Sequence, residues 1–434
     1  MHRCLPPRVV CRYTFPALAL LVTALVSAQS PGEKDPLASV SMSDLETEAS
    51  RSRKKADEVF RGATPLDTKD EQQDKAIDAQ VRYVLYRFHD VKANEPGFAD
   101  RVFQDFEDLQ LKPILANKEK NAGVAQLFTS KTIAHAKQVL HTPRPKYNAA
   151  AINAARVLAR LTKLGQPELA DALVDILKEE VEYDAKPGDP RRNDGVKLYV
   201  LRGLGEMLAY QEQNPPVLQK GQDAKIIEAL TAFIERKPPL ENNAASEEVD
   251  GFRALRREAV RALANGRVLP AQSVLVLLRV MARDGFNPEP RLDERVDAAV
   301  GVLRLNTEKD KEYQPDYAAY QVGLFVHALG KSVPKAKEEQ RPLKVWAARL
   351  ADGFEVLKAG AAKTKNDAAV KVADQCVKLL LSIEDKGALI NPAAVTELDN
   401  WLSANTPKSE SLYKGNKDAT VKPANRPEDE APDK

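Results

Sequence analysis

Residues 255–266 read LRREAVRALANG, and this stretch decides the fold because three other segments repeat its pattern. The three segments are INAARVLARL (152–161), VKLYVLRGLGEM (196–207) and VDAAVGVLRLN (296–306). When the four are aligned, one column holds Arg156, Arg202, Arg261 and Gly301. The column two positions later holds Leu158, Leu204, Leu263 and Leu303. Apolar residues recur in each segment at the 3.6-residue period of an amphipathic helix, so we expect four equivalent helices.

A second amphipathic helix is expected between each pair of aligned segments. The intervening sequences are PELADALVDILKEEV (167–181), AKIIEALTAFIER (224–236) and AQSVLVLLRVMARDG (271–285). A unit of two helices leaves one apolar face, which only a neighbouring unit can cover. Small residues on the aligned helices allow their backbones to approach closely; they include Ala154, Ala155, Gly203, Gly205, Ala259 and Ala262. The sequence therefore predicts stacked helix pairs.

The aligned segments resemble the second helix of HEAT repeats, and the helices between them resemble the first. This resemblance extends over about residues 120–400 and is clearest from 148 to 306. It implies an all-α fold in which antiparallel helix pairs form a right-handed superhelical stack, an α-solenoid, over residues 148–403. HEAT repeats have short turns inside each unit, whereas here the turns at 182–195, 237–251, 285–291 and 331–341 are long.

The two ends of the chain differ from the repeat region. Three arginines and a 14-residue apolar run, Tyr13–Val26, precede Val26-Ser27-Ala28, which is the pattern of a cleavable export signal. We therefore predict a signal peptide at 1–28, a linker at 29–42 and a helical N-terminal region at 43–140, with retention of the apolar run as an anchor left open. The protein is then exported to the periplasm or the extracellular space, with no membrane span after cleavage. Residues 404–434 are proline-rich and highly charged, so we expect a disordered tail.

The composition of the chain excludes some fold and function classes. The 434 residues carry 65 Lys and Arg against 63 Asp and Glu, a balance that argues against a nucleic-acid partner. Only 6% of the residues are aromatic and 20 are glycine, which favours helices over sheets. Cys4 and Cys11 belong to the predicted signal, and Cys376 lies in an amphipathic stretch where a buried, inert thiol is expected. Trp346 and Trp401 have apolar, periodic neighbours and are expected in the core or at its cap.

No catalytic, phosphate-binding, dinucleotide-binding or metal-binding motif occurs in the sequence, so neither a cofactor nor a metal is predicted. The favoured hypothesis is a non-catalytic scaffold that holds another envelope or secreted protein. The long turns are the candidate contact region, although tolerated insertions remain an equal alternative. Candidate contact residues in these turns are Asp189, Arg191, Arg192, Glu241, Glu247, Glu248, Lys335 and Lys337. The other function class is a glycosidase or polysaccharide lyase with an α/α-toroid fold.

Overall fold

The computed structural model describes residues 37, 39–90, 95–119, 122–142, 148–184, 192–213, 216–238, 240, 244–332, 343–383, 391–416 and 419–421. Over these residues the chain is helical, and its only β-type contacts are isolated bridges that join Tyr413 to Tyr313 and to Asn416. The prediction of an all-helical chain is confirmed for the described part. The predicted signal peptide lies outside the described residues.

In the described part of the chain, six helical segments precede α6 (Asn148–Leu161), which holds the first aligned segment of the repeat. They are α1 (Met42–Phe60), α2 (Glu71–Arg87), α3 (Phe98–Asp105), the π-helix η2 (Phe106–Leu111), α4 (Lys112–Ala116) and α5 (Ala122–Leu140). Asp70 caps α2 by accepting from the backbone N–H groups of Gln72 and Gln73. Helix α2 packs against α1 on one side and α5 on the other, which joins the N-terminal region to the repeat.

The remaining helices follow in regular succession after the short 3₁₀ turn η3 (Thr162–Leu164). They are α7 (Glu168–Asp184), α8 (Asp194–Leu208), α9 (Gln222–Glu235), α10 (Ser246–Leu263), α11 (Ala271–Ala282), α12 (Leu292–Leu303), α13 (Pro315–Ser332), α14 (Leu343–Lys363), α15 (Asp367–Leu381) and α16 (Pro392–Ala404). Asn193, Asn366 and Asn391 cap α8, α15 and α16 through side-chain oxygens that accept backbone N–H groups.

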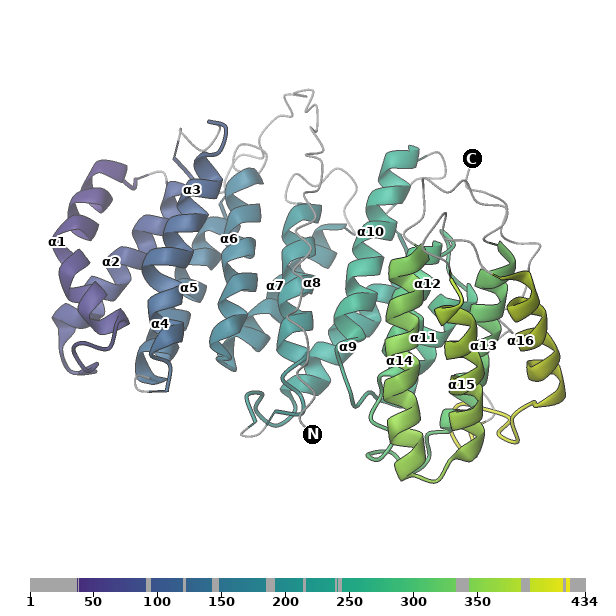
Figure 1. Cartoon of the computed structure of the whole chain (residues 1–434). Helices are drawn as coiled ribbons and strands as arrows, with labels where there is room; N and C mark the ends of the chain where they lie inside the picture. The colour runs from purple at the N-terminus through teal and green to yellow at the C-terminus, as the bar shows by residue number, and fades with distance from the viewer. Residues whose placement is uncertain are drawn as a thin grey trace. The chain divides into compact units, whose positions relative to one another are not determined.

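Alternate helices lie side by side in two layers (Figure 1). In the first layer α6, α8, α10, α12 and α14 each contact the next member, and in the second layer α5, α7, α9, α11 and α13 do the same. Helices of the two layers also contact one another in chain order, for example α7 with α8 and α11 with α12. The four aligned segments form α6, α8, α10 and α12, so they are equivalent in position as well as in sequence.

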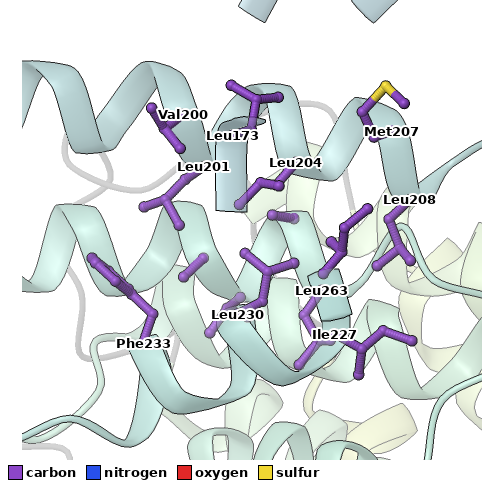
Figure 2. Close-up of a cluster of buried hydrophobic side chains, with 14 of the residues drawn as sticks. Leu173, Val200, Leu201, Leu204, Met207, Leu208, Ile227, Leu230, Phe233 and Leu263 are labelled. Atoms are coloured by element: carbon purple, nitrogen blue, oxygen red, sulfur yellow. The ribbon is translucent and has the colours of Figure 1, made fainter. Parts of the chain in front are cut away.

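The apolar core lies between the two layers. Leu158, Leu204, Leu263 and Leu303, the leucine column of the alignment, are all fully buried. Figure 2 shows Leu204 and Leu263 of the first layer beside Leu173 and Leu230 of the second. Each such leucine contributes about 1.5–3 kcal/mol through burial. The same core encloses Cys376, which is fully buried, and Trp346, which is 7% exposed, as the sequence predicts.

Glycines set the closest contacts within the first layer. A Cβ added to Gly205 would lie 2.8 Å from Ala262 Cα, and one added to Gly301 would lie 2.7 Å from Ala264 Cβ. Both distances are too short for real side chains, so α8, α10 and α12 approach closely only because these positions lack a Cβ.

The structure contradicts the prediction of disorder for the first part of the C-terminal segment. Leu412 is fully buried, and Tyr413 and Val421 are 6% and 8% exposed. The backbone N–H of Gln314 donates to Leu412 O, and the Tyr413 ring lies 5.7 Å from that of Tyr313. A few apolar residues in a polar segment are therefore enough to attach it to α13. Residues 422–434 lie outside the described part.

Within the described ranges no helix combines the length and apolar character that crossing a membrane requires.

Candidate functional site

Described residues at the ends of the long turns lie close to one another at α8, α10 and α12. Arg236, which ends α9, forms an ion pair of 3.6 Å with Asp184 at the end of α7. Arg291, just before α12, pairs at 2.5 Å with Asp250 in the first turns of α10. These contacts connect the turn before α8, the turn before α10 and the turn before α12. We name this region, where second-layer helices end and first-layer helices begin, the loop edge.

Three of the predicted contact residues can be placed on this edge. Arg192 is engaged, since its Nε lies 3.2 Å from Asp184 and 3.9 Å from Asp194. Glu247 and Glu248 are exposed, but they belong to the first turn of α10 and not to a loop. The predicted turn at 237–251 is therefore too long, because α10 already begins at Ser246. Asp189, Arg191, Glu241, Lys335 and Lys337 lie outside the described residues.

A buried lysine anchors the loop edge at α8. The Lys197 side chain is fully buried, and its Nζ donates to Asp184 at 2.5 Å and to Asp194 at 2.8 Å. Asp184 is itself only 5% exposed at its side chain. Because a buried charge requires an opposite charge nearby, this arrangement fixes the end of α7 against the start of α8.

A buried arginine plays the same part at α12. Arg256 and Glu294 are each 1% exposed and form two hydrogen bonds, of 2.7 and 3.2 Å. Arg256 also donates to Pro288 O at 2.7 Å, and Glu294 accepts from the Arg291 backbone N–H at 2.9 Å. Burial raises the pKa of Glu294, and the ion pair with Arg256 opposes that rise. The pair joins α10, α12 and the turn between α11 and α12.

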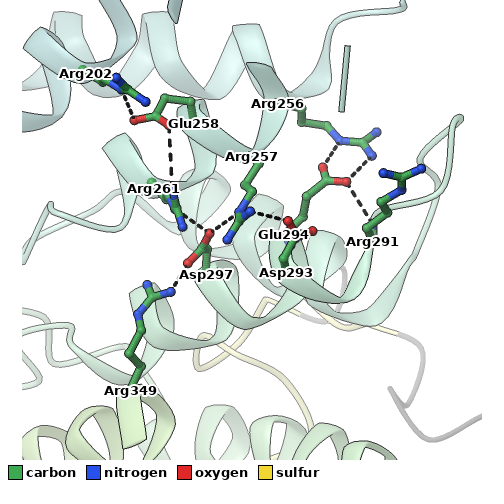
Figure 3. A network of polar contacts seen from close by, with 10 residues as sticks. All are labelled: Arg202, Arg256, Arg257, Glu258, Arg261, Arg291, Asp293, Glu294, Asp297 and Arg349. Carbon is green, nitrogen blue, oxygen red and sulfur yellow. Dashed lines mark hydrogen bonds and ion pairs between the residues drawn. The ribbon is translucent and has the colours of Figure 1, made fainter. Parts of the chain in front are cut away.

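Asp297 organises the neighbouring face of the first layer, as Figure 3 shows. Its fully buried carboxylate accepts from Arg257 at 2.9 Å and Arg261 at 2.7 Å, and it pairs with Arg349 of α14 at 2.5 Å. Arg202 of α8 pairs with Glu258 of α10 at 3.2 Å. Two members of the arginine column, Arg202 and Arg261, thus connect α8 to α10 and α10 to α12 through ion pairs, whereas Arg156 pairs with Asp100 of α3. This is a structural role.

The sequence predicts that arginine column but not its acidic partners. A signal was present: Arg257 and Arg261 are four residues apart, as are Asp293 and Asp297 on the next first-layer helix. Arg257 pairs with both aspartates. The two arginines and the two aspartates thus have the same spacing on helices that are expected to be neighbours. This match predicts ion pairs between the two helices.

A cavity of about 430 Å³ opens in the loop edge between α9, α10 and α11. Its lining consists of Glu235, Arg236, Lys237, Pro238, Arg256, Arg279, Gly285, Phe286 and Asn287. Arg236 has a side chain only 10% exposed, and burial lowers its pKa to about 10. The sequence does not show that these residues lie together, because they come from three helices and two turns.

The structure also assembles a hydrogen-bonded chain in the N-terminal region. His135 Nε2 lies 2.9 Å from Asp78 Oδ1, and its Nδ1 lies 2.8 Å from the Tyr86 hydroxyl. Tyr86 also donates to Gln138. Burial raises the pKa of Tyr86 to about 12, so its hydroxyl stays protonated and is poorly suited to act as a nucleophile. This chain joins α2 to α5 and serves packing.

The part of the chain that the structure describes contains no group of three or more His, Cys, Asp or Glu residues placed to hold a metal ion. Comparison of the sequence and the structure with protein-family models, curated proteins and solved structures gives no match.

Proposed function

We propose that this protein is an exported, non-catalytic scaffold that holds another envelope or secreted protein. In this proposal residues 1–28 direct export, and the helix pairs continue as a right-handed superhelical stack similar to HEAT repeats. The partner binds at the loop edge, where successive units present their long turns.

The observation that carries the proposal is the succession of contacts within each layer. Each first-layer helix from α8 to α12 contacts the first-layer helix before it and the one after it, and the second layer follows the same rule from α7 to α11. In such an arrangement every unit adds an equivalent stretch of surface, so the stack provides a series of similar sites for one large partner.

The composition of the loop edge supports binding there. Glu247 and Glu248 are exposed at the start of α10, and Arg192 is partly exposed before α8. Glu247 and Glu248 project from the start of α10 and Arg192 from the turn before α8, and the buried Lys197 and Arg256 ion pairs fix these helices in place. Variable turns on a rigid framework are a common arrangement for protein recognition.

Affinity purification from the native envelope fraction tests this function. The full chain carries a C-terminal tag, and the matched control has residues 240–244 replaced by a shorter Gly-Ser linker. We expect the full chain to retain one protein in stoichiometric amount and the control to lose it. The melting temperature of the control should lie within about 2 °C of the parent, because Leu240 and Ala244 at the two ends of this turn are only partly buried.

Two results would contradict the proposal in different ways. A partner retained equally by the shortened variant would remove the loop edge as the binding surface. Absence of any stoichiometric partner, together with breakdown of a polysaccharide by the purified chain, would replace the scaffold with the toroid enzyme.

A further inference from the structure

Three arginines that line the cavity in the loop edge alternate with three phenylalanines, of which Phe286 also lines it. The Arg236 guanidinium lies 3.4 Å from the centre of the Phe233 ring and 5.0 Å from that of Phe252. The Arg256 guanidinium follows, at 5.6 Å from Phe252 and 5.4 Å from Phe286. Arg279 completes the series at 5.3 Å from Phe286. We name these six residues the Arg–Phe series.

The contacts between arginines and rings leave the N–H donors of the guanidinium groups available for hydrogen bonds to a ligand. An aromatic ring attracts the face of a guanidinium group, whereas the five N–H donors lie in the guanidinium plane and point away from its edge. Arg279 uses its edge to donate to Glu235 at 2.9 Å and to Asp284 O at 3.3 Å. These contacts account for part of its donor capacity, so further N–H groups can reach a ligand in the cavity.

The cavity lining carries an excess of positive charge. Four cations, Arg236, Lys237, Arg256 and Arg279, face one lining carboxylate, Glu235. Two more carboxylates, which do not line the cavity, pair with lining cations: Glu294 with Arg256 and Asp184 with Arg236. Asp184 is shared with Lys197 and Arg192, so it neutralises Arg236 only in part. A partly enclosed site with excess cations attracts anions more strongly than an open surface does.

We propose that this cavity binds the carboxylate side chains of an acidic segment of the partner protein. The inference rests on the proposed scaffold function and names the chemistry of its partner. A planar carboxylate matches the in-plane donors of a guanidinium group, as the two bonds between Arg256 and Glu294 illustrate. Phe286 and Pro238 provide apolar contact for the methylene groups of Glu or Asp.

Two helix C-termini near the cavity oppose part of its positive charge. Helix α9 ends at Glu235 and α11 at Ala282, and both chain segments continue into the cavity lining. Each helix C-terminus carries about half a negative charge. This repulsion acts on every anion, so the binding of an acidic segment depends on the excess of lining cations.

The test measures binding of a hexaglutamate peptide with blocked ends to the full chain by calorimetry at fixed ionic strength. The cavity variant is Lys237→Gln with Arg279→Gln, two positions with partly or fully exposed side chains that leave the buried Arg256 pair intact. The control variant is Lys220→Gln with Arg304→Gln, which removes the same charge from exposed positions at the other ends of the helices. Hexaglutamine and inorganic phosphate are the reference ligands.

We expect the peptide to bind the parent, with an affinity about tenfold lower in the cavity variant and within twofold of the parent in the control. No binding, or an equal loss in both variants, would overturn the proposal, since equal loss reflects net charge alone. Phosphate that binds more tightly than the peptide would overturn the assignment of a carboxylate ligand. If the native partner is captured equally by the parent and the cavity variant, the scaffold function stands and this inference fails.

Discussion

Arg256 shows how single side chains determine the form of the loop edge. Its guanidinium is 1% exposed, held by Glu294 on one side and by Pro288 O on another, and lies between the rings of Phe252 and Phe286. A buried ion pair gives little net stability compared with apolar residues, but removing one partner leaves an uncompensated charge. The pair therefore fixes the position of the turn before α12 more than it adds to stability.

Replacement of Glu294 by Gln tests this role. We expect a loss of about 3 kcal/mol in the free energy of unfolding, because Arg256 would stay buried without a negative charge beside it. Urea unfolding of the full chain measures the loss. The control, Lys378→Gln, breaks the pair of Lys378 with Glu397, whose side chains are 60% and 53% exposed. It is expected to cost less than about 1 kcal/mol. Equal losses in the two variants would show that Arg256 does not depend on Glu294.

His327 makes stability depend on pH. It is 1% exposed in α13, and its Nε2 lies 3.5 Å from Asp399 of α16. Burial lowers its pKa below the ordinary 6.5, and the charge of Asp399 opposes this only in part. The unfolded chain therefore takes up a proton at higher pH than the folded chain does, so stability falls as the pH decreases below 6.5.

Replacement of His327 by Gln should reduce this dependence. Between pH 7.5 and pH 5.5 we expect the parent to lose more of its unfolding free energy than His327→Gln does, because only the parent carries the histidine whose pKa folding lowers. Urea unfolding at the two pH values measures the difference, and His141→Gln, at an exposed position, controls for the loss of a histidine. An identical pH dependence of the parent and His327→Gln would contradict the argument.

At the scale of elements, the first layer depends on close contact between successive helices. Gly205 and Gly301 remove the side chain where α8, α10 and α12 meet, and the Asp297 network joins α10, α12 and α14 on the same face. The two features act on the same helices, since the glycines let the backbones approach and the ion pairs join the side chains of neighbouring helices.

A glycine comparison tests the close approach. Gly205→Ala places a methyl group 2.8 Å from Ala262 Cα, so α8 and α10 must separate, at a cost of about 1–3 kcal/mol. Gly251→Ala in α10 meets no atom within 4 Å and should stabilise the chain by about 0.5–1 kcal/mol through helix propensity. Thermal unfolding measures both. A neutral or stabilising effect of Gly205→Ala would show that the two helices are not in such close contact.

At the scale of the whole molecule, the sequence predicts local patterns well and long-range partners poorly. The leucine column and the small residues were predictable because helical periodicity specifies which face is buried. The attachment of Leu412 to α13 was not predictable from the sequence. Its partners are about a hundred residues earlier, and the average composition of the segment suggests disorder. The cavity was missed for a related reason: Phe233, Phe252 and Phe286 follow no common spacing and meet only through the packing of three helices.

Site-specific photo-crosslinking tests the central claim, that a protein partner binds at the loop edge. In the test variant a photoreactive phenylalanine derivative replaces Glu248 at the start of α10. In the control variant it replaces Lys220 in the turn before α9. Each full chain is irradiated in the native envelope fraction. We expect one dominant protein adduct from position 248 and none from position 220. An adduct from position 220 alone would contradict the loop edge, and no adduct from either position would contradict the scaffold function.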